Sequence, residues 1–248
     1  MRTPTAALLV VGNEVLSAKV RDENGPWLAR RLRDLGVRLA AIHVLPDVVQ
    51  EIADALERER RRVTWVFTSG GVGPTHDDVT VAAVAQALGR PISRCARLAD
   101  AIRALHARHN AGEEAPEVAL RMADVPEGTR LLGDAAYPTL VVENVVMLPG
   151  VPEFLRYQFD RFAPELKSDP FRLASLYLSL GEDRIAPALD RVAREHADVD
   201  IGSYPRFDGA DHRVRVTVES KDADRVRAAV DAIRAALPPG AVVRIDEA

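Results

Sequence analysis

Short apolar runs alternate with amphipathic stretches along the first part of the chain. The apolar runs span residues 6–12, 37–46 and 63–71, and the stretches with helical spacing that follow them span residues 24–36, 48–62 and 77–89. The run at 6–12 is apolar on both faces, which is typical of a strand covered on both sides. Strands that alternate with helices predict an α/β fold, in which three layers surround a mostly parallel sheet.

In the next part of the chain, apolar runs and helical stretches no longer alternate. Residues 94–122 are more polar and are predicted to be helical. Three short strands are then expected at 130–133, 138–143 and 144–148, with a closing helix after them. Because these strands follow one another without a helix between them, they predict an antiparallel hairpin at the edge of the parallel sheet.

The rhythm changes again after residues 167–170, which read as a linker. From there the pattern predicts strand, helix, strand, strand, helix, strand, with the hairpin turn at 207–212. This βαββαβ order is that of ferredoxin-like α+β folds. We therefore expect two domains, a nucleotide-binding domain at 1–167 and a small C-terminal domain at 168–248.

Composition narrows the class of protein. The chain has 248 residues, of which 47% are apolar and 28% are charged, an ordinary globular mixture. Its apolar runs are far shorter than the roughly 20 residues of a membrane helix. The first run is interrupted at Gly12–Glu14, too early for a signal peptide, so it is interpreted as a buried strand. We expect a cytoplasmic protein with no membrane partner.

Charge and cysteine content exclude further classes of site. The formal net charge is −4, so no overall attraction to nucleic acid is expected. The C-terminal domain is not basic either, and its one obvious aromatic pair, Tyr204 and Phe207, argues against RNA binding. We expect that domain to pack against the first domain or a partner subunit. Cys95 is the only cysteine, which excludes an internal disulfide and a multi-cysteine metal site.

A glycine-rich loop follows the third predicted strand. Residues 68–80 read TSGGVGPTHDDVT and lead into a predicted helix. Glycines let backbone N–H groups approach an anion closely, and a helix N-terminus adds partial positive charge. The sequence is neither a Walker A motif nor a dinucleotide-binding fingerprint. The residues expected to bind a phosphate are Gly70, Gly71 and Gly73, with Thr68, Ser69, Pro74 and Thr75 beside them.

Two adjacent carboxylates, Asp77 and Asp78, complicate this interpretation because they would repel a phosphate. A divalent cation between the carboxylates and the phosphate would turn that repulsion into a bridge. The alternative is that Asp77 caps the helix and Asp78 is a solvated acid in its first turn. His76 either binds metal, acts as an acid or base, or lies on the surface.

Polar residues follow two other predicted strands, and parallel strands place such ends at one edge of a sheet. They are Gly12, Asn13, Glu14, Asp22 and Asn24 after the first strand, and Pro149, Gly150 and Glu153 after the last. The alternatives for these residues are a tight turn, a helix cap and a first-turn acid. His106 and His109 have the spacing of a metal pair, or of a solvated helix surface.

Three segments together resemble a known family. GNEVLSAKVRDENGPWLARRLRDLG, TSGGVGPTHDDVT and LPGVPEF are similar to the molybdopterin-binding domain of MoaB/MogA-like proteins. More closely, they resemble the version of this domain in the competence/damage-inducible CinA-like proteins and in the N-terminal hydrolase half of eukaryotic FAD synthase. The tail, with GEDRIAPALDRVA and DIGSYPRF, resembles the small domain that follows in CinA-like proteins.

The resemblance implies a pocket for a nucleotide or pterin at the glycine loop. It also implies metal-dependent pyrophosphatase activity, on ADP-ribose in CinA-like members and on FAD in the FAD synthase half. Relatives are oligomers, so a homodimer or higher homo-oligomer is expected. Two departures are visible: Glu23 stands where Thr or Ser is usual, and the family's Gly-Thr-Ala-Pro-Gly element is replaced by GDAAYPTLVVEN, closer to the FAD synthase half.

These observations lead to two main hypotheses, while the C-terminal domain argues against a third, an adenylyl-transferase acting on molybdopterin as in MogA-like relatives. The first is a pyrophosphatase that uses Mg²⁺, Mn²⁺ or Co²⁺, with Asp77, Asp78 and Glu14 as catalytic residues and Asp77, Asp78 and Asp22 as metal ligands. The second is a protein that binds molybdopterin or a nucleotide without catalysis. The deamidase domain of CinA and the adenylyl-transfer domain of FAD synthase have no counterpart in this sequence, so neither activity is expected.

Overall fold

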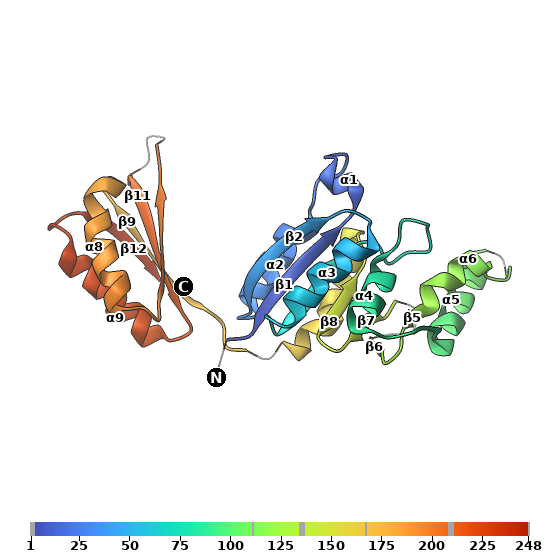
Figure 1. The fold of residues 1–248 in the computed structure, drawn as a ribbon. Helices are drawn as coiled ribbons and strands as arrows, with labels where there is room; N and C mark the ends of the chain where they lie inside the picture. Colours follow the sequence, from blue (N-terminus) through green and yellow to red (C-terminus); the bar gives the residue numbers. More distant parts are fainter. Residues whose placement is uncertain (1–2, 111, 134–136, 167, 208–210, 248) are drawn as a thin grey trace. The chain divides into compact units, whose positions relative to one another are not determined.

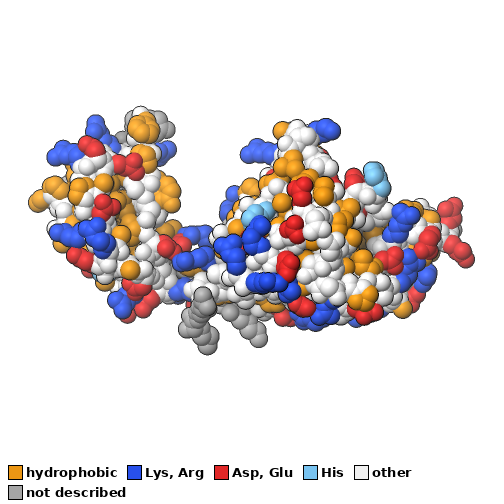
Figure 2. Space-filling view, in the orientation of Figure 1, with side chains coloured by type: hydrophobic (Ala, Val, Ile, Leu, Met, Phe, Trp, Pro, Cys, Tyr) orange, Lys and Arg blue, Asp and Glu red, His pale blue; other side chains and the backbone are white. Residues whose placement is uncertain are grey.

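A computed structural model describes residues 3–110, 112–133, 137–166, 168–207 and 211–247. The chain divides into two compact units, Met1–Ser168 and Asp169–Ala248 (Figure 1). Each unit has its own hydrophobic core. Charged side chains of both signs are interspersed over the visible face of each unit (Figure 2). In the described part of the chain, no helix has the length and apolar character needed to cross a membrane.

The first unit is built on a six-stranded sheet with the order β2-β1-β3-β8-β7-β6. Strands β2, β1, β3 and β8 pair in parallel, and β7 is antiparallel to both β8 and β6. The expected parallel sheet with an antiparallel addition is therefore confirmed. The strands are β1 (Thr5–Val11), β2 (Arg38–Leu45), β3 (Trp65–Ser69), β6 (Arg130–Leu132), β7 (Thr139–Val142) and β8 (Val145–Leu148).

Helices cover both faces of this sheet, as the strand pattern predicts. In β1, Leu8 and Val10 pack in the core that includes the helices α2 and α7, whereas Leu9 and Val11 pack in the core that includes α3 and α4. Both faces of β1 are thus apolar because both are covered. The helices are α2 (Asn24–Asp34), α3 (Val49–Arg60), α4 (Thr80–Leu88) and α7 (Pro152–Phe162).

The segment between α4 and β6 differs from the prediction of continuous helix over 94–122. The helices α5 (Ala96–His109) and α6 (Glu117–Leu120) are separate, and β4 (Ile92–Arg94) pairs with β5 (Asp124–Pro126) across them. Arg94 on β4 binds the carboxylate of Asp124 on β5 through Nε at 2.7 Å and Nη2 at 2.8 Å. These bonds close the segment into a small lobe.

The second unit has the predicted ferredoxin-like order. Its antiparallel sheet runs β10-β11-β9-β12, and Figure 1 shows α8 and α9 on the same face of it. The elements are β9 (Arg172–Leu178), α8 (Glu182–Glu195), β10 (Asp200–Pro205), β11 (Val214–Ser220), α9 (Ala223–Ala236) and β12 (Val242–Glu247). The expected turn at 207–212 and linker at 167–170 lie partly outside the described residues.

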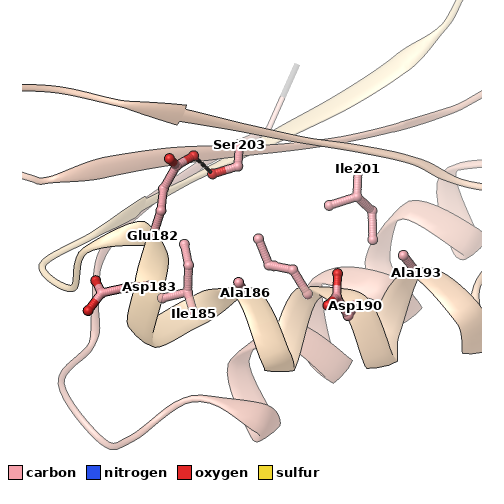
Figure 3. A pocket seen from close by; sticks show the side chains of 9 residues that line it. Glu182, Asp183, Ile185, Ala186, Asp190, Ala193, Ile201 and Ser203 are labelled. Carbon is pink, nitrogen blue, oxygen red and sulfur yellow. Dashed lines mark hydrogen bonds between the residues drawn. The ribbon is translucent and has the colours of Figure 1, made fainter.

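A groove separates α8 from the edge strand β10 (Figure 3). The hydroxyl of Ser203 on β10 donates a hydrogen bond of 2.6 Å to Glu182 at the start of α8. The floor is apolar, with Ile185 and Ile201, and further carboxylates of α8 lie along it. This side of the second unit therefore has an acidic groove.

Candidate functional site

The three segments singled out from the sequence meet at the carboxyl ends of β1, β3 and β8. Ser69 at the end of β3 pairs with Val10 of β1 and with Leu148 of β8. Gly12, Gly70 and the Pro149–Gly150 turn follow these strands directly. In an open α/β sheet this edge is where ligands bind. The structure thus brings together the segments that the sequence places far apart.

Asn24 connects two of these strand ends through its side chain. Its Nδ2 donates to Ser69 Oγ at 2.9 Å and to the backbone oxygen of Gly150 at 2.6 Å. The expected capping role belongs instead to Asp22, whose Oδ1 accepts from the backbone N–H groups of Asn24 and Gly25, both at 2.9 Å. The interpretation of Asn24 as a helix cap is therefore wrong, because its amide is used across the sheet.

Two buried polar atoms at this edge have no hydrogen-bond partner among the described residues: Asn24 Oδ1 and Thr68 Oγ1. Asn24 is only 7% exposed, and Thr68, on the central strand β3, is fully buried. A buried acceptor without a donor costs roughly 1–3 kcal/mol. A ligand or water that donates to Asn24 Oδ1 would remove that cost.

The glycine loop requires glycine at its first two positions. Gly70 and Gly71 have φ values of +102° and +68°, in the left-handed region. A Cβ on Gly70 would lie 2.3 Å from the backbone oxygen of Val11, and one on Gly71 would lie 2.4 Å from Thr80 Oγ1. Thr80, which sequence reasoning missed, is buried and donates from its hydroxyl to Gly70 O at 2.8 Å. These contacts hold the loop against β1 and the start of α4.

The backbone N–H groups of this loop are partly engaged within the protein. Gly70 N–H donates to Leu148 O at 3.1 Å, and Gly73 N–H donates to Asp78 Oδ1 at 2.7 Å. The expectation that the amides of Gly70, Gly71 and Gly73 all face a phosphate is therefore wrong for two of the three. Asp78 takes the position that an anion would occupy at Gly73.

The two aspartates precede α4 rather than beginning it, because the helix starts at Thr80. Asp78 also accepts from the N–H of Thr75 at 2.8 Å, so it closes a turn instead of lying in a helical first turn. Asp77 does not cap the helix; it is exposed and accepts from the Thr75 hydroxyl at 2.6 Å. That hydrogen bond, followed by one from its own backbone, lowers the pKa of Asp77 below its ordinary value.

The other candidate ligands of a metal are more scattered. Among the described residues, no group of three or more His, Cys, Asp or Glu side chains lies close enough to bind a metal. The Glu14 carboxylate folds back over Gly12, and Glu153 is exposed in the first turn of α7. The His76 side chain is 96% exposed, with Nδ1 3.9 Å from Asp77.

The end of β1 is fixed by a residue that the sequence did not indicate. Gly12 leads into a short helix, α1 (Asn13–Leu16), that was not predicted. The backbone N–H of Asn13 donates to Asp47 Oδ2 at 2.9 Å. Asp47 follows β2, so the neighbouring strand end holds the start of α1 in place.

His106 and His109, the other histidines considered as metal ligands, make contacts within their own helix end. His109 Nδ1 lies 2.9 Å from Leu105 O, and His106 Nδ1 lies 3.2 Å from Asn110 Nδ2. These contacts agree with a solvated helix surface.

An apolar hollow of about 130 Å³ begins at Val72 in the middle of the glycine loop. Its wall includes Tyr137, whose ring stacks on Phe154 with centroids 5.3 Å apart. The sequence feature that points to this hollow is the Tyr-Pro pair of GDAAYPTLVVEN. In the sequence analysis this segment counted only as a departure from the family's Gly-Thr-Ala-Pro-Gly element. The remaining lining residues are Leu98, Ile102, Leu105, Met122, Pro138, Leu140, Met147 and Gln158.

Comparison with known proteins agrees with this geometry. The family described as "Probable molybdopterin binding domain" matches residues 7–168, and "FAD synthase, middle domain" matches residues 170–246. A "Probable FAD synthase" of Caenorhabditis elegans is 31% identical over 255 residues, covering 93% of this chain and 49% of the relative. A "CinA-like protein" of Mycobacterium leprae is 40% identical over 167 residues, covering 63% of this chain and 39% of the relative.

The first unit also matches a solved structure. The protein CinA of Thermoplasma acidophilum, whose function is described as unknown, is 26% identical with a TM-score of 0.58, covering 66% of this chain and 98% of that one. The chain spans about half the length of the Caenorhabditis protein, 49%. The second unit matches the FAD synthase middle domain and the first unit is similar to CinA-like proteins; the chain belongs to the molybdopterin-binding domain family.

Proposed function

We propose that the first unit binds a nucleotide diphosphate compound, FAD or ADP-ribose, and hydrolyses its diphosphate bond with the help of a divalent cation. The observation that carries the proposal is the position of the apolar hollow at Val72, within the glycine loop itself. A ligand at this edge would meet an apolar wall and a polar loop a few residues apart. Compounds that combine a flat ring with a diphosphate fit such a site.

The size of the hollow suits one ring of the ligand. Its volume of about 130 Å³ is close to that of cavities of about 150 Å³ that hold one benzene molecule. Tyr137 and Phe154 are stacked against one another, with an angle of 13° between their rings. The exposed edge of this pair offers a surface to a heteroaromatic ring.

The polar side would hold the diphosphate. Gly71 is the glycine of the loop whose N–H is not engaged in the hydrogen bonds described above. Thr75 lies in the loop after β3, and Asn13 is the first residue of α1, which follows β1. Asn24 Oδ1 supports a ligand at this edge, because it is a buried acceptor in need of a donor. These groups would orient the diphosphate at the strand ends.

The residues present fit a cation that binds together with the diphosphate. They do not form a site in which protein side chains alone coordinate a metal. Mg²⁺ is commonly held by one or two carboxylates together with substrate phosphates and water. Asp77 is suited to this role because it is exposed and, like any aspartate whose pKa is not raised, it is ionised near neutral pH. The chemistry that such a cation supplies is neutralisation of the diphosphate and a lowered pKa for an attacking water.

A second candidate function is binding of molybdopterin or a nucleotide without hydrolysis. The observation that favours it is Asp78, whose two carboxylate oxygens accept from the N–H groups of Gly73 and Thr75. A carboxylate engaged in this way has a structural role in the loop. The same loop would then serve recognition alone.

Hydrolysis assays with FAD and ADP-ribose separate the two functions. We expect turnover with Mg²⁺, Mn²⁺ or Co²⁺, and a loss of at least tenfold in Asp77→Asn with ligand binding retained. If no cation supports turnover in protein that binds either compound, the first proposal is overturned and the second is favoured. A homodimer or higher homo-oligomer, expected from the sequence, remains a prediction for light scattering to check.

A further inference from the structure

Four side chains form a row across the sheet face of the second unit that α8 and α9 leave uncovered. The strand register pairs Tyr204 with Arg215, Arg215 with Tyr177, and Tyr177 with Arg244. The neighbours Val214 and Val216 on β11 point into the core beneath the helices, so Arg215 points to the opposite face. Arginine and tyrosine thus alternate across all four strands.

The two arginines are placed over the tyrosine rings. The guanidinium carbon of Arg244 lies 4.0 Å from the ring centroid of Tyr177, and that of Arg215 lies 5.2 Å from that of Tyr204. Stacking orders the guanidinium plane while leaving its N–H donors available at the edge. No described carboxylate forms an ion pair with Arg215. Arg244 has a 3.6 Å contact with the half-exposed Asp246, and its charge is one of the causes that lower the pKa of Asp211.

The row lines a hollow of about 540 Å³, in the size range of small-molecule sites. Pro205, Arg206, Asp211 and His212 also line it. Asp211 binds His212 Nδ1 at 2.6 Å, and the buried His212 ring stands edge-on to Tyr177 with centroids 4.8 Å apart. Asp211, the one carboxylate among the described lining residues, is therefore engaged by His212, whereas three arginines line the same space.

This positive charge is local. From residue 169 onward the chain has 12 Lys and Arg against 15 Asp and Glu, so the unit as a whole is acidic. We propose that the hollow binds a nucleoside monophosphate, with the phosphate held by Arg215 and Arg244 and the base against Tyr204, which is 49% exposed. Planar arginine forks bind phosphate oxygens in pairs, and tyrosine faces stack with bases. The inference does not depend on the function proposed for the first unit.

The surroundings favour a small ligand over a nucleic acid strand. Two positions along the sheet from Tyr204 and Arg215, Gly202 pairs with the neutral Thr217, and beyond them Asp200 pairs with Glu219. The groove on the helix side of the same unit has Glu182, Asp183 and Asp190 along it (Figure 3). A polynucleotide needs a positive groove that follows its backbone. Here Arg206 and Arg213 extend the positive charge by one pair in one direction, and in the other direction it gives way to a neutral pair and then an acidic pair.

Calorimetric titration of the full chain with 5′-AMP, inorganic phosphate and adenosine tests the proposal. We expect 5′-AMP to bind more tightly than phosphate, and adenosine to bind more weakly than 5′-AMP. The double variant R215Q/R244Q should weaken 5′-AMP binding at least tenfold. The matched control R191Q/R194Q removes the same charge from α8 on the helix face and should change the affinity less than twofold.

Three results would overturn the proposal: equal 5′-AMP affinity in R215Q/R244Q and wild type, equal affinity for adenosine and 5′-AMP, or tighter binding of a ten-nucleotide single strand than of 5′-AMP. Equal 5′-AMP affinity in R215Q/R244Q and wild type would mean that the arginines and tyrosines of the row only stabilise the fold, through their cation–π pairs. Should the double variant not fold, protection of Tyr204 from nitration by 5′-AMP in the wild type decides the question, and absence of protection refutes it.

Failure of this proposal can be distinguished from failure of the proposed hydrolysis. R215Q/R244Q leaves the first unit unchanged, so its hydrolysis of FAD or ADP-ribose should equal that of the wild type. Conversely, R215Q/R244Q should weaken 5′-AMP binding by the same factor in the Asp77→Asn background as in the wild type. Hydrolysis therefore reports on the first unit, and the part of the 5′-AMP affinity that R215Q/R244Q removes reports on the second unit.

Discussion

The side-chain amide of Asn24 donates a 2.6 Å hydrogen bond to the backbone oxygen of Gly150, a residue 126 positions later in the chain. The same nitrogen binds Ser69, at the end of the central strand β3. One buried side chain at the start of α2 therefore holds the ends of β3 and β8 together. These are the strand ends from which the candidate site is built.

We expect Asn24→Ala to lower the free energy of unfolding by about 1–3 kcal/mol, because it leaves a buried hydroxyl and a carbonyl without their donor. Urea unfolding monitored by circular dichroism measures this. The control is Asn110→Ala, at the exposed end of α5, where the amide donates to His106 O. That change should stay within about 0.5 kcal/mol. Equal stability of the two variants would contradict the role given to Asn24.

A comparison of two glycines tests the packing of the loop. Gly70 and Gly89 both have positive φ, but a Cβ on Gly70 would meet Val11 O at 2.3 Å whereas one on Gly89 would meet nothing within 4 Å. We expect Gly89→Ala to cost about 1 kcal/mol from backbone conformation alone. Gly70→Ala should cost about 1–3 kcal/mol more, because the backbone must move. Similar urea unfolding midpoints for the two variants would contradict the close contact between Gly70 and Val11.

The layers of the fold were predictable because a strand that is buried on both faces has apolar side chains at adjacent positions. Leu8 and Leu9 face opposite cores, so the first strand is apolar throughout. The role of Asp78 was not predictable in the same way. An aspartate just before a helical pattern is usually a cap or a first-turn acid. Its actual partners, Gly73 and Thr75, face it only because the chain reverses within the loop.

The apolar hollow and the Asn24 contacts were hidden for a related reason. Val72 reads as one apolar residue among glycines, and its importance depends on Tyr137 and on α5, which are distant in the chain. Motif spacing located the strand ends correctly because parallel strands place them at one edge. It could not say which polar atoms face a ligand and which face the protein, since hydrogen-bond partners are set by tertiary contacts.

The two neighbouring aspartates should respond differently to amidation. In Asp78→Asn, an NH₂ group replaces one of the two carboxylate oxygens that accept from the N–H groups of Gly73 and Thr75. Two donors then face one another, so we expect the free energy of unfolding to fall by about 1–3 kcal/mol. Asp77→Asn changes an exposed side chain and should leave stability within about 0.5 kcal/mol. Thermal and urea unfolding of both variants measures this. Equal destabilisation by the two changes would contradict the assignment of Asp78 as the residue that closes the loop.

A buried carboxylate on α3 supplies a prediction about pH. The Glu59 side chain is 1% exposed and accepts hydrogen bonds from Arg58 Nε at 3.0 Å and Arg62 Nη1 at 3.2 Å, with His43 Nε2 also 3.2 Å away. Burial raises the pKa of Glu59, but the Arg58 hydrogen bond and the charges of Arg62, His43 and Arg58 outweigh it. The net pKa lies below the ordinary value of 4.5.

Because the folded pKa of Glu59 is below its unfolded value, its charge stabilises the fold above about pH 4.5, and this contribution is lost as the pH falls through the folded pKa. We expect Glu59→Gln to be less stable than wild type by about 1–3 kcal/mol at pH 7, with a gap that narrows below pH 4.5. Urea unfolding between pH 7 and 3 measures the gap. Glu57→Gln, an exposed carboxylate paired with Arg61 on the same helix, is the control and should show almost no gap. A Glu59→Gln deficit that is constant from pH 7 to 3 would show that the Glu59 charge does not stabilise the fold.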